Sequence, residues 1–187
     1  MKHLSLITSI LIASTALMAQ PTEPTEIKKE GIGYIKMLGK ALKSELKQHL
    51  QADKTGLEAI HFCSTKAQAI TAEVNKQLPP YAKVRRTALK VRNLANTPDE
   101  TDIKVMKAYE AKIEQGTFDP KDIEVVKAGE TYRVYKPLLA QKVCLKCHGT
   151  QIDPKIEATI KKYYPKDQAI GFKEGDLRGV IVAEIKK

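Results

Sequence analysis

The chain has 187 residues, which is enough for one domain of ordinary size with a buried core. Its formal net charge is +10, and the basic residues are spread along the chain without the interleaved aromatic residues of a protein that binds single-stranded nucleic acid. A nucleic-acid partner is therefore not predicted. The basic residues are instead interpreted as solvated side chains on helix faces, as a docking surface for an acidic redox partner, or as a surface for peripheral association with an anionic membrane.

The first nineteen residues have the pattern of a secretory signal peptide. An uncharged apolar stretch runs from Leu4 to Ala19 after a single lysine, and a polar run follows it. We expect cleavage after Ala19 or Ala16; an uncleaved membrane anchor is the alternative, although the stretch is short for a membrane span. The signal predicts a periplasmic protein in which residues 20–29 form a polar leader and residues 30–187 form a single domain.

Two helices are predicted at the start of the mature chain. Apolar residues at three- and four-residue steps predict a helix over residues 26–51, although three glycines interrupt the pattern in its first half. The same spacing predicts one helix over residues 54–76, and Pro79 and Pro80 end it.

The rest of the chain predicts shorter elements. Residues 81–98 are expected to be extended or irregular, and the acidic residues that follow them begin a third helix. Helices that come first and an antiparallel sheet that comes later give an α+β fold. The later elements, in chain order, are a helix over residues 99–115, a hairpin over residues 123–135 that Pro137 closes, a helical or looped segment at 139–149, a helix over 154–163 and a strand over 179–185.

The segment Cys144-Leu145-Lys146-Cys147-His148 carries the most specific chemistry in the sequence. Two cysteines separated by two residues and followed by a histidine are typical of haem c attachment, in which both sulfurs bind vinyl groups and the imidazole ligates the iron. The motif therefore predicts one covalently bound haem c, with Cys144, Cys147 and His148 as its binding residues.

Other functions of a Cys-x-x-Cys pair fit the sequence less well. A thioredoxin-like pair would open a helix after a strand in a βαβ unit, whereas this pair follows a hairpin. A zinc site needs two further ligands, and Cys63, His49 and His61 are all far away in the sequence. A disulfide between Cys144 and Cys147 is the remaining alternative in an oxidising compartment.

The third cysteine, Cys63, has no protein thiol left to pair with once the haem motif is assigned. It lies on the apolar stripe of the helix predicted over residues 54–76 and therefore faces an interior that should contain the haem. It is a small buried apolar side chain, one half of an intermolecular disulfide or the second axial ligand of the iron. Met106, His49 and His61 are alternative ligands, an open coordination position is a further alternative, and the spacing alone leaves the choice open.

Five segments of the chain together resemble one known family: Cys63–Ala67, Val84–Asp99, Tyr135–Leu138, Cys144–Gly149 and Gly175–Gly179. They follow the order of the PAS-like single-haem c-type cytochrome domain, which occurs in stand-alone secreted proteins and in sensory domains of bacterial membrane receptors and kinases. The chain departs from that pattern at Leu94, where proline is usual, and we expect only a looser turn there. The resemblance implies N-terminal helices packed on a small antiparallel PAS-like β-sheet, and an iron held by His148 and Cys63.

Basic residues crowd the segment from Arg85 to Arg92. They form either a solvated strand face or part of the haem pocket, because guanidinium groups bind carboxylates such as the haem propionates through two hydrogen bonds. Side chains alternate in an extended segment, so Arg86 and Lys90 share one face while Arg85 lies on the other. The resemblance favours the haem pocket, with Arg85, Arg86 and Arg92 as candidate cofactor-binding residues and the choice among them open.

These features together predict a periplasmic monohaem c-type cytochrome that transfers electrons to a redox partner protein. The alternative is a haem-based redox or gas sensor that works with a separate receptor. The sequence ends after its last predicted strand without a transmitter segment, which favours the electron carrier. An enzyme such as a peroxidase would need an open distal site with acid–base residues and is not predicted.

Overall fold

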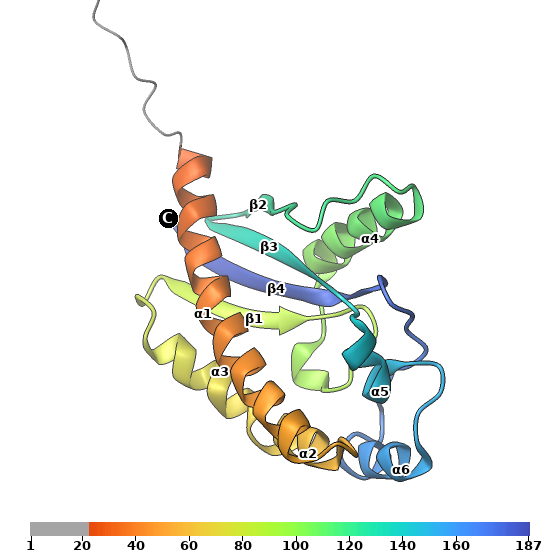
Figure 1. The fold of residues 1–187 in the computed structure, drawn as a ribbon. Helices are drawn as coiled ribbons and strands as arrows, with labels where there is room; N and C mark the ends of the chain where they lie inside the picture. The colour runs from red at the N-terminus through yellow and green to blue at the C-terminus, as the bar shows by residue number, and fades with distance from the viewer. Residues whose placement is uncertain (1–22) are drawn as a thin grey trace, which may run out of the picture.

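The computed structural model describes residues 23–187, so the predicted signal peptide and its cleavage sites lie outside the described residues. In the described part, helices surround a four-stranded antiparallel sheet with the strand order β1-β4-β3-β2 (Figure 1). This arrangement confirms the predicted α+β class. No helix within residues 23–187 is both long and apolar enough to cross a membrane.

The helices and strands follow the predicted order along the chain. The hairpin, the two later helices and the last strand form where the residue pattern places them, and two 3₁₀ turns, η1 and η2, are added. The elements are α1 (Glu23–Ala52), α2 (Leu57–Thr65), α3 (Ala67–Lys76), β1 (Ala82–Thr87), η1 (Leu94–Asn96), α4 (Glu100–Glu114), β2 (Glu124–Ala128), β3 (Thr131–Leu139), η2 (Lys142–Cys144), α5 (Leu145–His148), α6 (Pro154–Tyr163) and β4 (Leu177–Lys186).

Helix α1 begins inside the segment predicted as a polar leader, residues 20–29. It is helical from Glu23, and Ile27 is buried in the core, so the packed part of the chain begins before residue 30. Glycine is required within this helix at Gly31, where a Cβ atom would lie 2.5 Å from Cγ2 of Val134. The missing side chain lets α1 lie directly against the sheet, which it crosses diagonally (Figure 1).

The prediction of one continuous helix over residues 54–76 is wrong, because the helix breaks between α2 and α3 at Lys66. The hydroxyl groups of Ser64 and Thr65 donate to the carbonyl oxygen of His61 at 2.9 and 2.8 Å. Hydroxyl groups that bond back to the preceding turn bend helices, and the backbone at Lys66 departs from ideal helical geometry with φ of −114°.

Strand β3 continues past Pro137 to Leu139, whereas the sequence predicted that the proline would end it. Proline has no backbone N–H to donate to a neighbouring strand, so it fits a strand only where no neighbour needs that hydrogen bond. Strand β2 pairs with β3 only as far as Tyr135, so β3 is an edge strand at Pro137 and bonds to β4 alone. The extension carries the chain directly to the haem-type motif.

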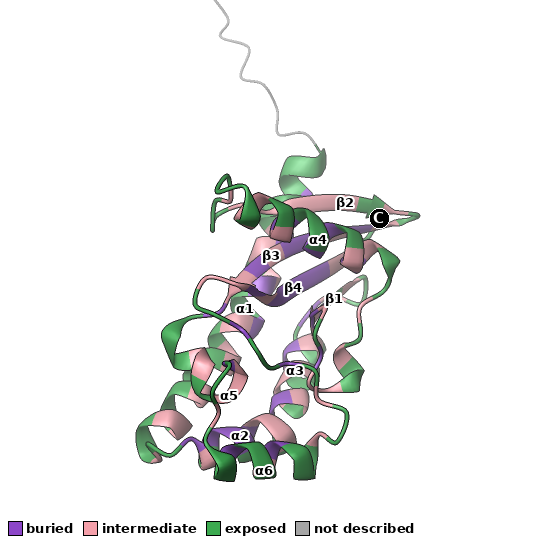
Figure 2. Cartoon of the chain, turned by 90° about the vertical axis from the view of Figure 1, so that its right-hand side faces the viewer, coloured by how far each residue is buried: buried purple, intermediate pink, exposed green. Residues whose placement is uncertain are grey.

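Strand β4 is central in the sheet and buried on both faces. Ile181, Ala183 and Ile185 belong to the core under α1, whereas Val180 and Val182 belong to the core under α4. Figure 2 shows this burial along β3 and β4. Helices α2, α5 and α6 lie beyond one end of the sheet (Figure 1), and this arrangement leaves room for a cavity between them and the strands.

Candidate functional site

A cavity of about 310 Å³ lies between the sheet and the helices beyond its end. Its walls come from the end of α1, from α2, from β1 and the loop that follows it, from η2 and α5, and from the start of β4. Most of the lining is apolar, as expected of a pocket for a large organic ligand. The apolar lining residues are Leu46, Leu50, Ala59, Ile60, Ala67, Ala88, Val91, Leu138, Val143 and Val180.

The Cys144-x-x-Cys147-His148 motif forms one wall of this cavity. The 3₁₀ turn η2 leads directly into α5, and all three side chains line the cavity. A Cβ atom at Gly149 would lie 2.5 Å from the carbonyl oxygen of Leu145, so glycine is what lets the chain turn away after the motif. Both thiols are free, and burial raises the pKa of the Cys147 thiol.

His148 is held in one tautomer. Its Nδ1 lies 2.7 Å from the carbonyl oxygen of Ala169, and because a carbonyl oxygen only accepts, Nδ1 carries the proton. Burial, with help from Arg178 and Arg92, lowers the pKa of the imidazole well below 6.5. The ring is therefore neutral, and Nε2 keeps the lone pair with which histidine ligates metals.

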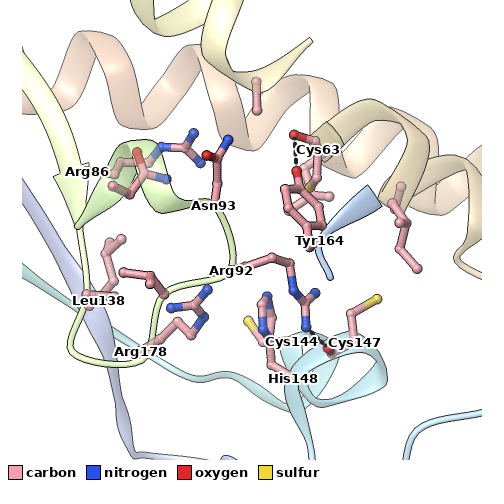
Figure 3. A pocket seen from close by; sticks show the side chains of 18 of the residues that line it. Cys63, Arg86, Arg92, Asn93, Leu138, Cys144, Cys147, His148, Tyr164 and Arg178 are labelled. Atoms are coloured by element: carbon pink, nitrogen blue, oxygen red, sulfur yellow. Dashed lines mark hydrogen bonds between the residues drawn. The ribbon is translucent and has the colours of Figure 1, made fainter. Parts of the chain in front are cut away.

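Cys63 comes from α2 on the wall opposite His148 (Figure 3). Its carbonyl oxygen accepts a hydrogen bond from the hydroxyl of Tyr164 at 2.9 Å, which holds α2 against the segment after α6. Burial raises the pKa of the Cys63 thiol, and the cationic arginines of the cavity act in the opposite direction. A sulfur and an imidazole nitrogen therefore lie on opposing walls.

The three alternative ligands do not line this cavity. Met106 is fully buried in the core between α4 and the sheet. His49 stacks on Phe62 with the ring centroids 4.9 Å apart, and exposed His61 lies 3.4 Å from the hydroxyl of Tyr163. Both histidines line a separate groove between α1 and the pair α2 and α3. The cavity therefore places Cys63, and none of these three, opposite the motif.

Two arginines line the cavity without a carboxylate partner among the described residues. Nε of Arg86 is buried and has no hydrogen-bond partner within residues 23–187, and burial lowers the pKa of this guanidinium. Arg178 makes one long hydrogen bond of 3.4 Å to the carbonyl oxygen of Lys90, and its guanidinium lies 5.3 Å from the ring centroid of Phe172. Burial, followed by repulsion from Arg92, lowers the pKa of Arg178 to about 10.

The other two predicted arginines already have partners in the protein. Arg85 does not reach the cavity, because strand alternation turns it to the other face, where it bonds Asp102 and Glu184 at 2.9 and 2.7 Å. Arg92 lines the cavity, but its guanidinium pairs with the carboxylate of Asp167 at 3.0 Å. Of the three predicted arginines, Arg86 alone therefore points unpaired into the cavity.

Sequence reasoning missed Arg178 and Tyr164 as site residues. Arg178 follows Leu177 in β4, which is otherwise buried as far as Ala183, and a lone arginine in such a segment is a signal that could have identified it. Tyr164 gave no such signal, because only the fold brings α6 beside α2. Within residues 23–187, no three His, Cys, Asp or Glu side chains gather closely enough to hold a bare metal ion.

Comparisons with known proteins agree with this fold. The family model described as Tll0287-like matches residues 6–185. Among solved structures, the chain is similar to the crystal structure of the cyanobacterial heme-protein Tll0287, with a TM-score of 0.59 and 23% identity over 89% of this chain and 98% of that one. At this identity the likeness is one of fold. None of the curated proteins compared with the chain matches it.

Proposed function

The chain belongs to the Tll0287-like family, and we propose that it is a periplasmic monohaem c-type cytochrome that transfers electrons. The observation that carries the proposal is a single apolar cavity with the Cys144-x-x-Cys147-His148 motif on one wall and Cys63 on the opposite wall. The similar cyanobacterial structure is described as that of a heme-protein. The periplasmic location is inferred from the signal sequence predicted for residues 1–19.

The sulfur and nitrogen atoms of the cavity suit a covalently bound haem. The free thiols of Cys144 and Cys147 can each add S–H across one vinyl C=C bond and form a thioether. Nε2 of His148 and Sγ of Cys63, which come from opposing walls of the cavity, would be the protein ligands of the haem iron. With a donor atom of the protein available on each of two opposing walls, an electron carrier is favoured over an enzyme such as a peroxidase.

The two arginines without carboxylate partners give an independent test of whether the cavity suits a haem. A buried guanidinium without a partner costs free energy, and Arg86 has such an Nε atom among the described residues. The two propionates of a haem are carboxylates that could pair with Arg86 and Arg178, which line the same cavity. These two cations therefore match the charge of the ligand that we propose.

Bound haem would supply an iron that gains and loses one electron. The chain contributes an apolar lining that keeps water from the site, and a thiolate at Cys63 would lower the reduction potential by stabilising the ferric state. A chain with a net charge of +10 would also attract an acidic redox partner protein.

The test uses the full chain matured with haem in a bacterial periplasm. Haem should stay bound after denaturation, and the ferric protein should give a low-spin, thiolate-type absorption spectrum. Cys63→Ala should abolish the thiolate features, whereas the matched control Met106→Leu, in the α4 core, should keep them. A wild-type spectrum in Cys63→Ala would remove Cys63 as a ligand, and loss of haem on denaturation would contradict covalent attachment.

Carbon monoxide separates the carrier from the sensor that works with a separate receptor. The ferrous carrier should bind CO weakly or slowly, because Cys63 would already hold the iron as a ligand and would have to be displaced. Fast, tight binding of CO with loss of the thiolate features would favour the sensor instead.

A further inference from the structure

Arg92 joins three segments of the cavity wall. Its Nη2 donates to the carbonyl oxygen of Cys147 at 2.6 Å (Figure 3) and to that of Ala169 at 3.1 Å. Its Nε and Nη2 also donate to the two carboxylate oxygens of Asp167 at 3.1 and 3.0 Å. The side chains of Arg92 and Asp167 are only 10% and 8% exposed. The pair therefore ties the loop after β1 to α5 and to the segment that follows α6.

One carbonyl oxygen in this network accepts two donors. The Ala169 carbonyl oxygen receives the Nδ1 proton of His148 at 2.7 Å and an Nη2 proton of Arg92 at 3.1 Å. The Ala169 peptide is itself fixed, because its N–H donates to Oδ1 of Asp167 at 2.9 Å. Asp167 thus holds both the guanidinium and the peptide that the imidazole contacts.

The shared carbonyl has a consequence for the imidazole. The stronger the hydrogen bond from Nδ1–H, the more anionic the ring becomes and the more strongly its other nitrogen donates to a metal. An oxygen that already accepts a proton from a cation is a weaker acceptor for a second donor. Arg92 should therefore limit the electron donation of His148, and its bond to the Cys147 carbonyl should limit movement of the ring.

We propose that Arg92, held by Asp167, is a positioning residue for His148 that fixes the imidazole and weakens its Nδ1–H bond through the shared Ala169 carbonyl. This inference rests on the proposed function, because it requires Nε2 of His148 to ligate a haem iron. A less anionic imidazole stabilises the ferric state less. The reduction potential is therefore higher than the same pair of ligands would give without Arg92.

The test compares variants of the haem-loaded full chain by redox titration and by electron paramagnetic resonance of the ferric protein. In Arg92→Gln the ratio of ferrous to ferric protein at a fixed ambient potential should fall about tenfold, a shift of about 59 mV for one electron. The low-spin g values, which report the axial ligands, should also shift. Lys90→Gln is the matched control, because it removes a nearby cation that does not contact Ala169 and should keep the g values.

Asp167→Asn distinguishes positioning from simple charge. Removal of a negative charge alone would raise the potential and leave the g values unchanged, whereas loss of the hold on Arg92 and Ala169 should shift the g values as Arg92→Gln does. If Arg92→Gln does not fold, Arg92→Lys gives the same test, because one ammonium cannot replace all four hydrogen bonds.

The outcomes separate this inference from the proposed function. The positioning role is overturned if Asp167→Asn and Arg92→Gln (or Arg92→Lys, where Arg92→Gln does not fold) both keep the wild-type g values. In that case the spectrum of the wild-type chain would still support a haem protein. A wild-type chain without covalent haem would overturn the proposed function and this inference together.

Discussion

Two neighbouring arginines of β1 have different surroundings because side chains alternate along a strand. Arg85 is paired with Asp102 and Glu184 on the α4 side of the sheet. Arg86 points into the cavity, where its buried Nε has no partner within residues 23–187. An unpaired buried guanidinium lowers stability, so the arrangement at Arg86 is easier to understand as a binding site for an anion than as a stabilising feature.

Asp102 is a buried carboxylate that binds side chains of β1 and β3 on the α4 side of the sheet. It is fully buried, accepts two hydrogen bonds from the guanidinium of Arg85 and accepts the hydroxyl proton of Tyr135 at 2.9 Å. Asp102→Ala leaves these donors without their acceptor, and we expect the free energy of unfolding to fall by about 3–5 kcal/mol. Urea denaturation followed by circular dichroism measures this loss.

The control for that variant is Glu73→Gln. Glu73 pairs with Lys76 at 3.1 Å, but both side chains are exposed. Exposed pairs contribute about 1 kcal/mol or less, so this variant should unfold close to the wild-type midpoint. Equal midpoints for Asp102→Ala and Glu73→Gln would contradict the importance assigned to the buried carboxylate.

At the level of elements, two glycines of α1 should respond to the same substitution with opposite signs. In Gly31→Ala the new methyl group would meet Val134 at 2.5 Å, and overpacking of this kind costs roughly 1–3 kcal/mol. At Gly33 a methyl group meets nothing within 4 Å, so Gly33→Ala should stabilise the helix by roughly 0.5–1 kcal/mol. Chemical denaturation of both variants tests this; stabilisation by Gly31→Ala would show that α1 can move away from the sheet.

Sequence periodicity predicted the elements better than their ends. The stripe of apolar residues located α1, but the pattern could not show that Gly31 is needed for close packing or that burial of Ile27 extends the helix to Glu23. The break at Lys66 depends on hydroxyl groups bonding back to one carbonyl, which the apolar pattern does not report. Side-chain hydroxyl groups that compete with backbone N–H groups for a carbonyl oxygen thus decide where a helix ends.

At the scale of the whole molecule, the site is assembled from segments that the sequence keeps far apart. The motif was recognisable from its own spacing, and the helical stripe directed Cys63 toward the interior. The Ala169 carbonyl could not be found in this way, because its role comes from a contact with His148 in α5 that only the fold creates. Every residue has a backbone carbonyl, so the residue pattern cannot show which one binds the imidazole.

The fold also protects two tyrosines from ionisation. Burial raises the pKa of Tyr109 and Tyr135 above the ordinary value for tyrosine. The Tyr109 hydroxyl donates to the carbonyl oxygen of Tyr135 at 3.2 Å, and the Tyr135 hydroxyl donates to Asp102. Both hydroxyl groups lie between α4 and the sheet, so their protons are lost easily only when that layer opens.

Stability should therefore fall in alkaline solution. Because the folded pKa of Tyr135 exceeds the unfolded value of about 10, its contribution is complete below that pH and is lost as the pH rises toward the folded value, at about 1.4 kcal/mol per pH unit. Tyr135→Phe removes one such group, so its free energy of unfolding, measured in urea at a series of pH values, should fall less steeply above about pH 10. Tyr163→Phe alters an exposed ring and should keep the wild-type slope. A wild-type slope in Tyr135→Phe as well would mean that Tyr135 ionises in the folded protein without resistance from its surroundings.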